Sequence, residues 1–397
     1  MKKGLVRLLA LLLIPLLLTG ALGCLWYDQL TAELAADYNP EQGRSFGLDQ
    51  RSKGLELLRL GLRRNDLLML GSSELDLRVP QNPQEVFPNT QLNRNVILVG
   101  GACTQCLQDM TTAGALAEEL SGKQAVLVLS IQWFFGRDGI GSDEYRARFS
   151  ELQFYAFFRS ARVAPEQKEY LARRACQLLA GDSSFAGPRL YAWLHSGSNV
   201  FQVLGRVLFA PYFSLRYRFL QLQDAFRART VSRQYADAPA RAARSMDWNA
   251  EMLLAEEQGR AACTNNELYV ADWYYSRYLA PQWEQLAGIL DGVDPAVTRE
   301  LEDYEQMLRV FRDADVDLYL VFMSANGWYY DYNGLDAGER AALYDALGAL
   351  AEEYGFGYLD TRNLEYEPYS YYDVMHLGWK GWLYVDEQIA DYFTDAA

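Results

Sequence analysis

Histidine is scarce in this chain: only His195 and His376 occur among 397 residues. Because imidazole is the side chain that exchanges a proton most readily near neutral pH, any histidine-dependent chemistry has just two candidates. His376 lies three residues after Asp373, a spacing that lets the carboxylate hold one ring nitrogen while the other accepts a proton from a hydroxyl. His195 falls in a predicted helical region, and we interpret it as a partly buried structural residue.

Cysteine is also sparse, with five residues in the chain. Only Cys103 and Cys106 are closely spaced, and neither a second such pair nor a neighbouring histidine accompanies them. This pattern argues against zinc, and we predict neither a metal nor a cofactor. Two interpretations of the pair remain: a disulfide formed outside the cell, or small buried side chains at the start of a helix.

Positive charge is in short supply. The chain has 37 Lys and Arg against 52 Asp and Glu, which gives a net charge of −15. Nucleic acid is therefore excluded as the main partner, since neutralising phosphates requires basic residues. Residues 205–245 are an exception, because this stretch contains eight arginines and only two acidic residues, Asp224 and Asp237. We interpret this stretch as a solvated helix surface or as a patch for an anionic polymer or lipid headgroups.

Charge is absent altogether from the run Leu8–Trp26, which follows Lys2, Lys3 and Arg7. Such a run is about long enough to cross a bilayer, and the preceding positive charges predict that the chain after it lies outside. We expect residues 1–27 to be a single-pass anchor in the cell membrane and residues 28–397 an extracellular domain. A cleaved signal peptide and lipoprotein processing at Cys24 are the alternatives.

Half of the chain is apolar, which is enough for a substantial core. Five short apolar runs, each ending in small or polar residues, predict buried parallel strands and thus an α/β fold with helices flanking a parallel sheet. Their ranges are 67–70, 96–99, 125–129, 317–323 and 356–359. Between 142 and 285 the periodicity is helical, which predicts a large helical insertion. Within it we expect helices over 166–179, 200–209, 215–230 and 240–257.

Ser73 follows the first predicted strand in the sequence Gly71–Leu75. Ligands of open α/β sheets bind at the carboxyl ends of the strands, so a hydroxyl placed there is a candidate nucleophile. A serine at this position is equally typical of a helix cap. The second strand ends in Gly100 and Gly101, either of which could present a backbone N–H to the same site.

A serine after the first strand and Asp-x-x-His near the end of the chain resemble the SGNH hydrolase superfamily. Five segments together also resemble the DltD family of D-alanyl-lipoteichoic acid biosynthesis proteins, and the last of them is the most specific. The segments are Gly71–Leu75, Ser130–Phe134, Phe149–Glu151, Thr264–Asn266 and Asp373–Trp382.

The resemblance implies a Ser-His-Asp triad in which Ser73 is the nucleophile, His376 the base and Asp373 its orienting partner. It implies an oxyanion donor at Gly100 or Gly101. The asparagine donor of the superfamily is replaced by Gln132 and Trp133 at the end of the third strand, which leaves the oxyanion and substrate-binding groups only partly assigned.

The same resemblance implies transfer of D-alanine to the hydroxyls of teichoic acid at the outer face of the membrane. The implied partners are the polymer, a membrane-bound acyltransferase of the D-alanylation pathway and, as a further candidate, the D-alanyl carrier protein. Two alternatives stay open. One is a non-catalytic, membrane-anchored scaffold for the D-alanylation machinery, and the other is acyl transfer to a different envelope polymer.

Overall fold

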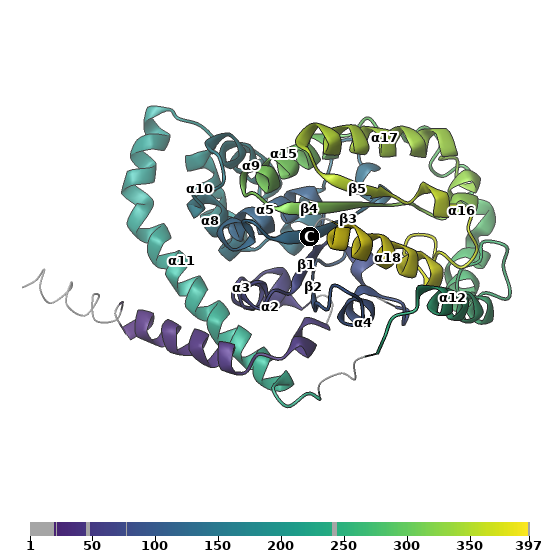
Figure 1. Cartoon of the computed structure of the whole chain (residues 1–397). Coiled ribbons are helices and arrows are strands. Elements are labelled where there is room, and N and C mark those ends of the chain that lie inside the picture. The colour runs from purple at the N-terminus through teal and green to yellow at the C-terminus, as the bar shows by residue number, and fades with distance from the viewer. Residues whose placement is uncertain (1–19, 21, 45–47, 77, 240–243, 396–397) are drawn as a thin grey trace, which may run out of the picture.

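The computed structural model describes residues 20, 22–44, 48–76, 78–239 and 244–395 (Figure 1). At its centre lies a five-stranded sheet whose neighbouring strands are all parallel, in the order β2-β1-β3-β4-β5. Every predicted strand is confirmed to within one residue at either end. The strands are β1 (Leu67–Leu70), β2 (Val96–Val99), β3 (Gln124–Ser130), β4 (Asp317–Met323) and β5 (Gly357–Asp360).

The order of the strands creates a switch point beside β1. This strand pairs with β2 on one side and with β3 on the other. The chain runs from β1 to β2 on one side and then returns past β1 to β3 on the other. In an open parallel sheet the crevice at the carboxyl ends of two such strands is the usual place for a ligand. Gly71, Ser72 and Ser73 follow β1 directly into this crevice.

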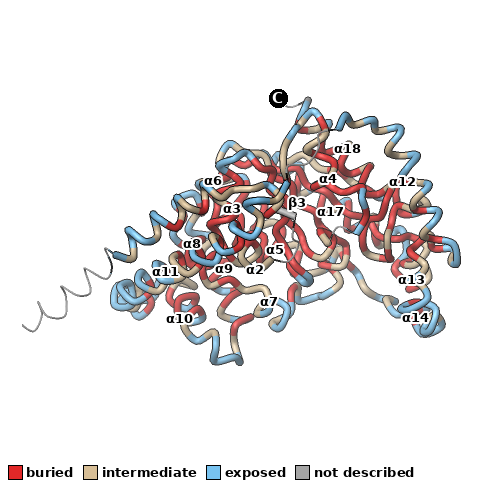
Figure 2. The backbone as a smooth tube through the Cα atoms, turned by 90° about the horizontal axis from the view of Figure 1, so that it is seen from below, coloured by how far each residue is buried: buried red, intermediate tan, exposed pale blue. Residues whose placement is uncertain are grey.

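Helices cover both faces of the sheet because alternate residues of each strand point to opposite sides. Leu68 and Leu70 belong to one apolar core and Leu67 and Met69 to the other. The first core includes α3 (Glu56–Arg63), α5 (Cys106–Ala115), α8 (Glu151–Arg159), α9 (Pro165–Leu178), α15 (Glu300–Asp313) and α17 (Ala337–Tyr354). The second includes α4 (Pro83–Val86), α12 (Trp248–Ala262) and α18 (Trp379–Asp395). Figure 2 shows this buried interior around α5, β3 and α17.

All regular elements described between β3 and β4 are helical. The longest is α11 (Val200–Tyr235), where the sequence predicts two helices interrupted near Pro211. That prediction is wrong, because the proline is accommodated inside one continuous helix. Residues 207–212 are exposed, so a carbonyl deprived of its N–H partner by the proline can be hydrated.

The helix α12 begins at Trp248, after a capping Asp247, rather than at residue 240; residues 240–243 lie outside the described part of the chain. The boundaries of the insertion at 142 and 285 stay a prediction.

The N-terminal part of the described chain is a helix over residues 22–36 that packs against the C-terminal end of α11. Leu34 lies in a small apolar cluster with Ala228 and Val231, and Glu33 pairs with Arg229. Most of the predicted membrane anchor, residues 1–27, lies outside the described residues. Among those that are described, no helix combines the length and apolar character needed to cross a bilayer.

A buried arginine ties the C-terminal half of the sheet domain to the segment that leads to Asp373 and His376. Arg340 of α17 has no exposed surface. It donates to both carboxylate oxygens of Glu365 at 3.1 and 2.7 Å and to Asp331 at 2.8 Å. An ion pair desolvated in this way is costly to leave half-formed, since the remaining charge stays buried without its partner.

We therefore expect Arg340→Met to lower the free energy of unfolding by about 3–5 kcal/mol, because it strands Glu365 in the interior. Urea unfolding followed by circular dichroism measures this. The matched control is Arg309→Met, which removes a partly exposed pair with Glu305 and should cost less than about 1 kcal/mol. An equal loss of unfolding free energy in the two variants would contradict the larger contribution of the buried pair between Arg340 and Glu365.

Candidate active site

Three residues that lie far apart in the chain meet at the switch point of the sheet. Ser73 begins a short 3-10 turn, η2 (Ser73–Leu75), immediately beyond β1. Asp373 and His376 come from the loop between β5 and α18. Nε2 of His376 lies 3.0 Å from Oγ of Ser73, and Nδ1 lies 2.8 Å from each carboxylate oxygen of Asp373. The hydroxyl, imidazole and carboxylate thus form one hydrogen-bonded line, with the nitrogen nearer the serine placed to accept its proton.

The carboxylate of Asp373 accepts hydrogen bonds from several donors. Its Oδ1 accepts the backbone N–H groups of Met375 at 2.8 Å and His376 at 2.9 Å. Its Oδ2 accepts from Nη1 of Arg78 at 3.2 Å, and the side chain is only 1% exposed. These bonds fix the rotation of the carboxylate and hence of the imidazole. Arg78 was missed in the sequence because no motif distinguishes a single arginine in an irregular segment.

The loop that carries Asp373 and His376 is closed on itself. The N–H of Tyr372 donates to the carbonyl of His376 at 2.9 Å, and that of Gly378 to Ser370 at 2.7 Å. A side chain at Gly378 would place its Cβ 2.6 Å from the backbone carbon of Tyr371, so only glycine allows this approach. The geometry of the Asp-x-x-His turn therefore depends on backbone packing as well as on its own side chains.

The segment Thr264–Asn266, one of the five segments that carry the family resemblance, makes turns. Asp272 accepts the N–H of Thr264 at 2.6 Å and of Asn265 at 3.1 Å, and Nδ2 of Asn266 donates to the carbonyl of Val270 at 2.8 Å. Beyond this turn, the N–H of Ala271 donates to the carbonyl of Tyr372 at 2.9 Å. These residues thus support the histidine loop from outside.

The two glycines after β2 lie against the start of the serine turn. A Cβ on Gly100 would come within 2.1 Å of the Gly71 carbonyl oxygen, and the Ser72 hydroxyl donates to the Gly101 carbonyl at 3.1 Å. The close approach explains the need for glycine at position 100. Both residues adjoin the segment that carries Ser73, and the choice between them as an oxyanion donor stays open.

Gln132 and Trp133 follow β3 in the short turn η4 (Ile131–Phe134). Nε2 of Gln132 donates to the hydroxyl of Tyr330 at 2.8 Å, and burial together with the negative charge of Asp373 raises the pKa of that phenol. Tyr330, the hydrogen-bond partner of Gln132, therefore lies within electrostatic reach of Asp373. Trp133 is 5% exposed and belongs to the apolar core on the α5 side of the sheet, so its position is that of a packing residue.

Comparison with known proteins places this arrangement in a family. Residues 49–394 match the family model described as DltD protein. The chain belongs to the DltD family. It is 28% identical over 329 residues to Protein DltD of Bacillus subtilis, with 82% of each chain covered. It is 25% identical over 386 residues to Protein DltD of Staphylococcus aureus, with 95% of this chain and 94% of the relative covered.

A third relative, Protein DltD of Lacticaseibacillus rhamnosus, is 23% identical over 342 residues, which cover 85% of this chain and 79% of the relative. The match to the DltD family model includes Ser73, Asp373 and His376. It therefore extends over the whole sheet and over both segments that form the hydrogen-bonded line.

Beneath the serine turn of this DltD-family chain lies a buried carboxyl that sequence reasoning did not single out. Glu74 is 2% exposed, and its Oε1 accepts the N–H of Ser72 at 2.6 Å. Burial raises the pKa of Glu74 to about 7, while the backbone bonds and His376 oppose that rise. Burial also raises the pKa of Asp109, and the charges of Glu74 and Glu300 add to it. A line of buried acids thus extends from the serine turn into the core.

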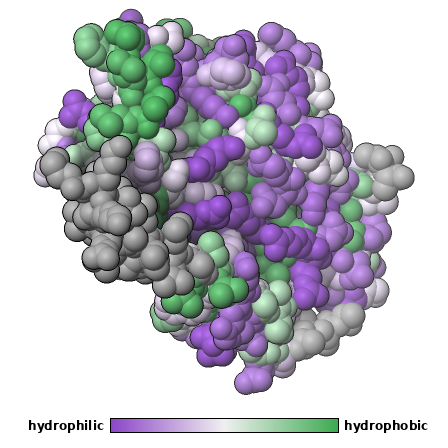
Figure 3. All heavy atoms as spheres, turned by 90° about the vertical axis from the view of Figure 1, so that its left-hand side faces the viewer, coloured by the Kyte–Doolittle hydropathy of each residue, from purple (hydrophilic) through white to green (hydrophobic). Residues whose placement is uncertain are grey.

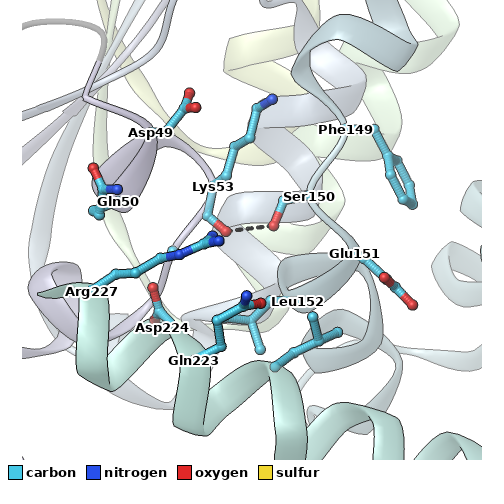
Figure 4. A pocket seen from close by; sticks show the side chains of 12 residues that line it. Asp49, Gln50, Lys53, Phe149, Ser150, Glu151, Leu152, Gln223, Asp224 and Arg227 are labelled. Carbon is cyan, nitrogen blue, oxygen red and sulfur yellow. Dashed lines mark hydrogen bonds between the residues drawn. The ribbon is translucent and has the colours of Figure 1, made fainter.

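One pocket of the described chain lies apart from the triad. It measures about 180 Å³ between α2 (Asp49–Ser52), α8 and α11 (Figure 4). Ser150 donates to the carbonyl of Lys53 at 2.5 Å on one wall, and Asp224 on another accepts the N–H groups of Leu55 and Glu56 at 2.8 and 3.0 Å. Asp224 thus caps the start of α3, Glu151 joins α8 to α11 through Arg216, and no triad residue lines the pocket.

The remaining candidates take structural positions. His195 ends α10 (Ala186–His195), where its Nδ1 contacts the Tyr191 carbonyl at 2.8 Å and its ring packs on Phe158, which agrees with the predicted structural role. Cys106 is buried as the first residue of α5, whereas Cys103 is exposed. Both are free thiols, so the structure has the helix-start arrangement for Cys106 and not the disulfide.

The raised pKa of Glu74 gives a pH dependence with a definite sign. In the unfolded chain this carboxyl returns to its ordinary pKa of 4.5, so the folded protein binds the proton more tightly. The associated stability is fully present below about pH 4.5 and is lost as the pH rises through about 7. For Glu74→Gln, which cannot ionise, we expect the loss between about pH 5 and pH 8 to be smaller by as much as roughly 3 kcal/mol.

Urea unfolding of the wild type and of Glu74→Gln across this pH range measures the difference. Glu305→Gln is the control, since Glu305 is partly exposed and its pKa is lowered by its hydrogen bonds to Arg309 and Tyr354. If the wild type and Glu74→Gln lose stability in parallel as the pH rises, the pKa of Glu74 is the same in the folded and unfolded states. That result would contradict the raised pKa of Glu74 in the folded protein.

Proposed function

We propose that this DltD-family chain is a serine-dependent acyltransferase or (thio)esterase that transfers D-alanine to teichoic acid hydroxyls at the outer face of the membrane. The observation that supports this most directly is the 3.0 Å separation of Nε2 of His376 from Oγ of Ser73, with Asp373 behind the imidazole. The parallel sheet with its serine after β1 and its Asp-x-x-His before the last helix also supports an SGNH-hydrolase-like assignment.

In the proposed reaction His376 accepts the proton of the Ser73 hydroxyl as Oγ attacks the carbonyl of an activated D-alanine. Asp373 holds Nδ1–H and stabilises the imidazolium that forms. The proton then passes from Nε2 to the leaving group, which departs and leaves D-alanine esterified to Ser73. A polymer hydroxyl, or water, next gives its proton to His376 and takes the acyl group, which restores the Ser73 hydroxyl.

The negative charge on the carbonyl oxygen needs donors at the carboxyl edge of the sheet. The candidates are the N–H of Ser73 and the N–H of Gly100 or Gly101, since the glycine strand end adjoins the serine turn. The Gln132 amide is a further candidate at the end of β3, where its bond to the Tyr330 hydroxyl would orient it. These groups belong to three neighbouring segments, as a site at a switch point requires.

The proposed partners follow from the same assignment: the teichoic acid polymer, a membrane-bound acyltransferase of the pathway and the D-alanyl carrier protein. An extracellular position disfavours direct contact with a cytosolic carrier, so the acyltransferase is the favoured immediate partner. The polymer is anionic while the chain carries a net charge of −15, which makes local arginines the expected contacts.

We expect a strain whose only copy carries Ser73→Ala to lose D-alanine esters from its envelope, because removing the nucleophile should cost about a thousandfold or more in rate. Alkaline release and quantification of D-alanine measure the ester content, with protein level checked by immunoblot. The control is Ser196→Ala, the same change at the C-terminal end of α10, where Ser196 donates to the carbonyl of Trp193 in its own helix and accepts from Gln202.

Retention of the esters at normal protein level would overturn the catalytic assignment. It would favour the alternative in which the chain is a membrane-anchored scaffold for the D-alanylation machinery. Loss in both variants would point to reduced folding or assembly, which the immunoblot distinguishes from lost chemistry.

A further inference from the structure

The N-terminal half of α11 presents an unusual surface for a water-soluble domain. Many of its large apolar side chains are mostly exposed, including Phe201 at 74%, Val207 at 73% and Leu208 at 74%. Contiguous exposed apolar surface of this kind marks a site of interaction. The group, which we call the α11 face, comprises Val200, Phe201, Val203, Leu204, Val207, Leu208, Phe209, Tyr212, Leu215 and Phe219.

The α11 face follows helical geometry. Phe201, Leu204, Leu208, Leu215 and Phe219 recur at intervals of three, four, seven and four residues, which places them on one side of the helix. The stripe extends over about 30 Å, since each residue adds roughly 1.5 Å. The opposite side holds the few contacts to the body, such as buried Gln202, Phe213 and Tyr217. The N-terminal half of the helix therefore turns an apolar side away from the domain.

The C-terminal half of the same helix behaves differently. Ala225, Ala228 and Val231 are buried, the last two in the cluster with the helix over residues 22–36. One half of α11 is thus covered by the chain itself and the other is not. The exposed N-terminal half of α11 is therefore a candidate interaction surface.

The position of the N-terminal chain identifies that partner. The helix over residues 22–36 leaves the domain on the side where α11 rises, at the left of Figure 1. Its outer end exposes Leu22 at 64%, Leu25 at 66% and Trp26 at 51%. These residues close the uncharged run Leu8–Trp26 that precedes the domain in the sequence. Figure 3, which views this side, shows hydrophobic residues gathered at its upper edge.

Charge points to the same partner. The helix α11 contains six arginines and one acidic residue, Asp224, whereas the whole chain has a net charge of −15. Arg206 and Arg218 flank the α11 face, as does Trp193 of α10, which is 43% exposed, and Tyr212 belongs to the face itself. Apolar side chains bordered by arginine and interfacial aromatics are the composition of a helix that lies in a membrane interface.

We infer that the α11 face lies on the lipid bilayer, with its apolar side chains among the upper acyl chains and its arginines at anionic headgroups. This surface would add a second membrane contact to the N-terminal segment. Two separate contacts restrict rotation of the domain about its attachment, and so fix how the carboxyl edge of the sheet faces the membrane. A second copy of the chain or a membrane protein on this surface is the competing occupant.

The test uses the full chain reconstituted into vesicles of phosphatidylcholine and phosphatidylglycerol that contain nitroxide-labelled acyl chains. A bimane fluorophore is attached at Leu208→Cys, with Cys24, Cys103 and Cys176 changed to serine so that the accessible thiols do not react. The matched control is Leu253→Cys on α12, whose leucine is 72% exposed against 74% for Leu208. Both side chains are exposed, so neither label disturbs the core.

We expect lipid quenching at position 208 to exceed that at position 253 several-fold, and to fall when Leu204 and Val207 are both changed to serine. Flotation confirms that each protein is on the vesicles. Equal quenching at the two positions would overturn the inference and leave the surface to a second copy or a protein partner. Failure of the full chain to float with the vesicles would also overturn it.

Discussion

The hydrogen bond between Nε2 of His376 and Oγ of Ser73 joins residues 303 positions apart in the chain. It forms only if β1 ends at the switch point and the loop before α18 returns to the same edge of the sheet. The parallel order of strands, the close approach at Gly100 and the closed loop around Gly378 all serve that meeting. The contact between the Ser73 hydroxyl and the His376 imidazole thus depends on the strand order and on the backbone packing of both loops.

The sequence predicted the sheet well because buried parallel strands leave a strong signal: short apolar runs bounded by small residues. The sequence also predicted Ser73, Asp373 and His376 as candidate site residues. Ser73 follows the first predicted strand, and His376 is one of two histidines and lies three residues after an aspartate. Other features carry no such signal. Arg78 reaches Asp373 from a segment without a motif, and the pairing of Gln132 with Tyr330 links residues 198 apart. The continuity of α11 through Pro211 is possible because residues 207–212 are exposed to solvent, and local helix propensity does not report this exposure.

Buried carboxyls give the site an electrostatic character that composition alone does not indicate. Glu74 beneath the serine turn and Asp109 beside it both have raised pKa values because of burial. Asp373 accepts hydrogen bonds from backbone N–H groups and from Arg78. Buried acids with raised pKa values thus lie beside the serine turn, and groups with perturbed pKa values are typical of catalytic sites. Contact of the α11 face with a membrane would orient the domain. The carboxyl edge of the sheet, which carries Ser73, would then face a substrate confined to the envelope.

The measurement that tests the central claim most directly is covalent labelling of the purified full-length chain with a fluorophosphonate, followed by peptide mass spectrometry. A serine activated by a histidine reacts with such a reagent, whereas an ordinary serine does not. The account predicts a phosphonyl adduct on Ser73 that disappears in His376→Ala and persists in His195→Ala. An adduct that survives the loss of His376, or an unmodified Ser73 in the folded wild type, would contradict it.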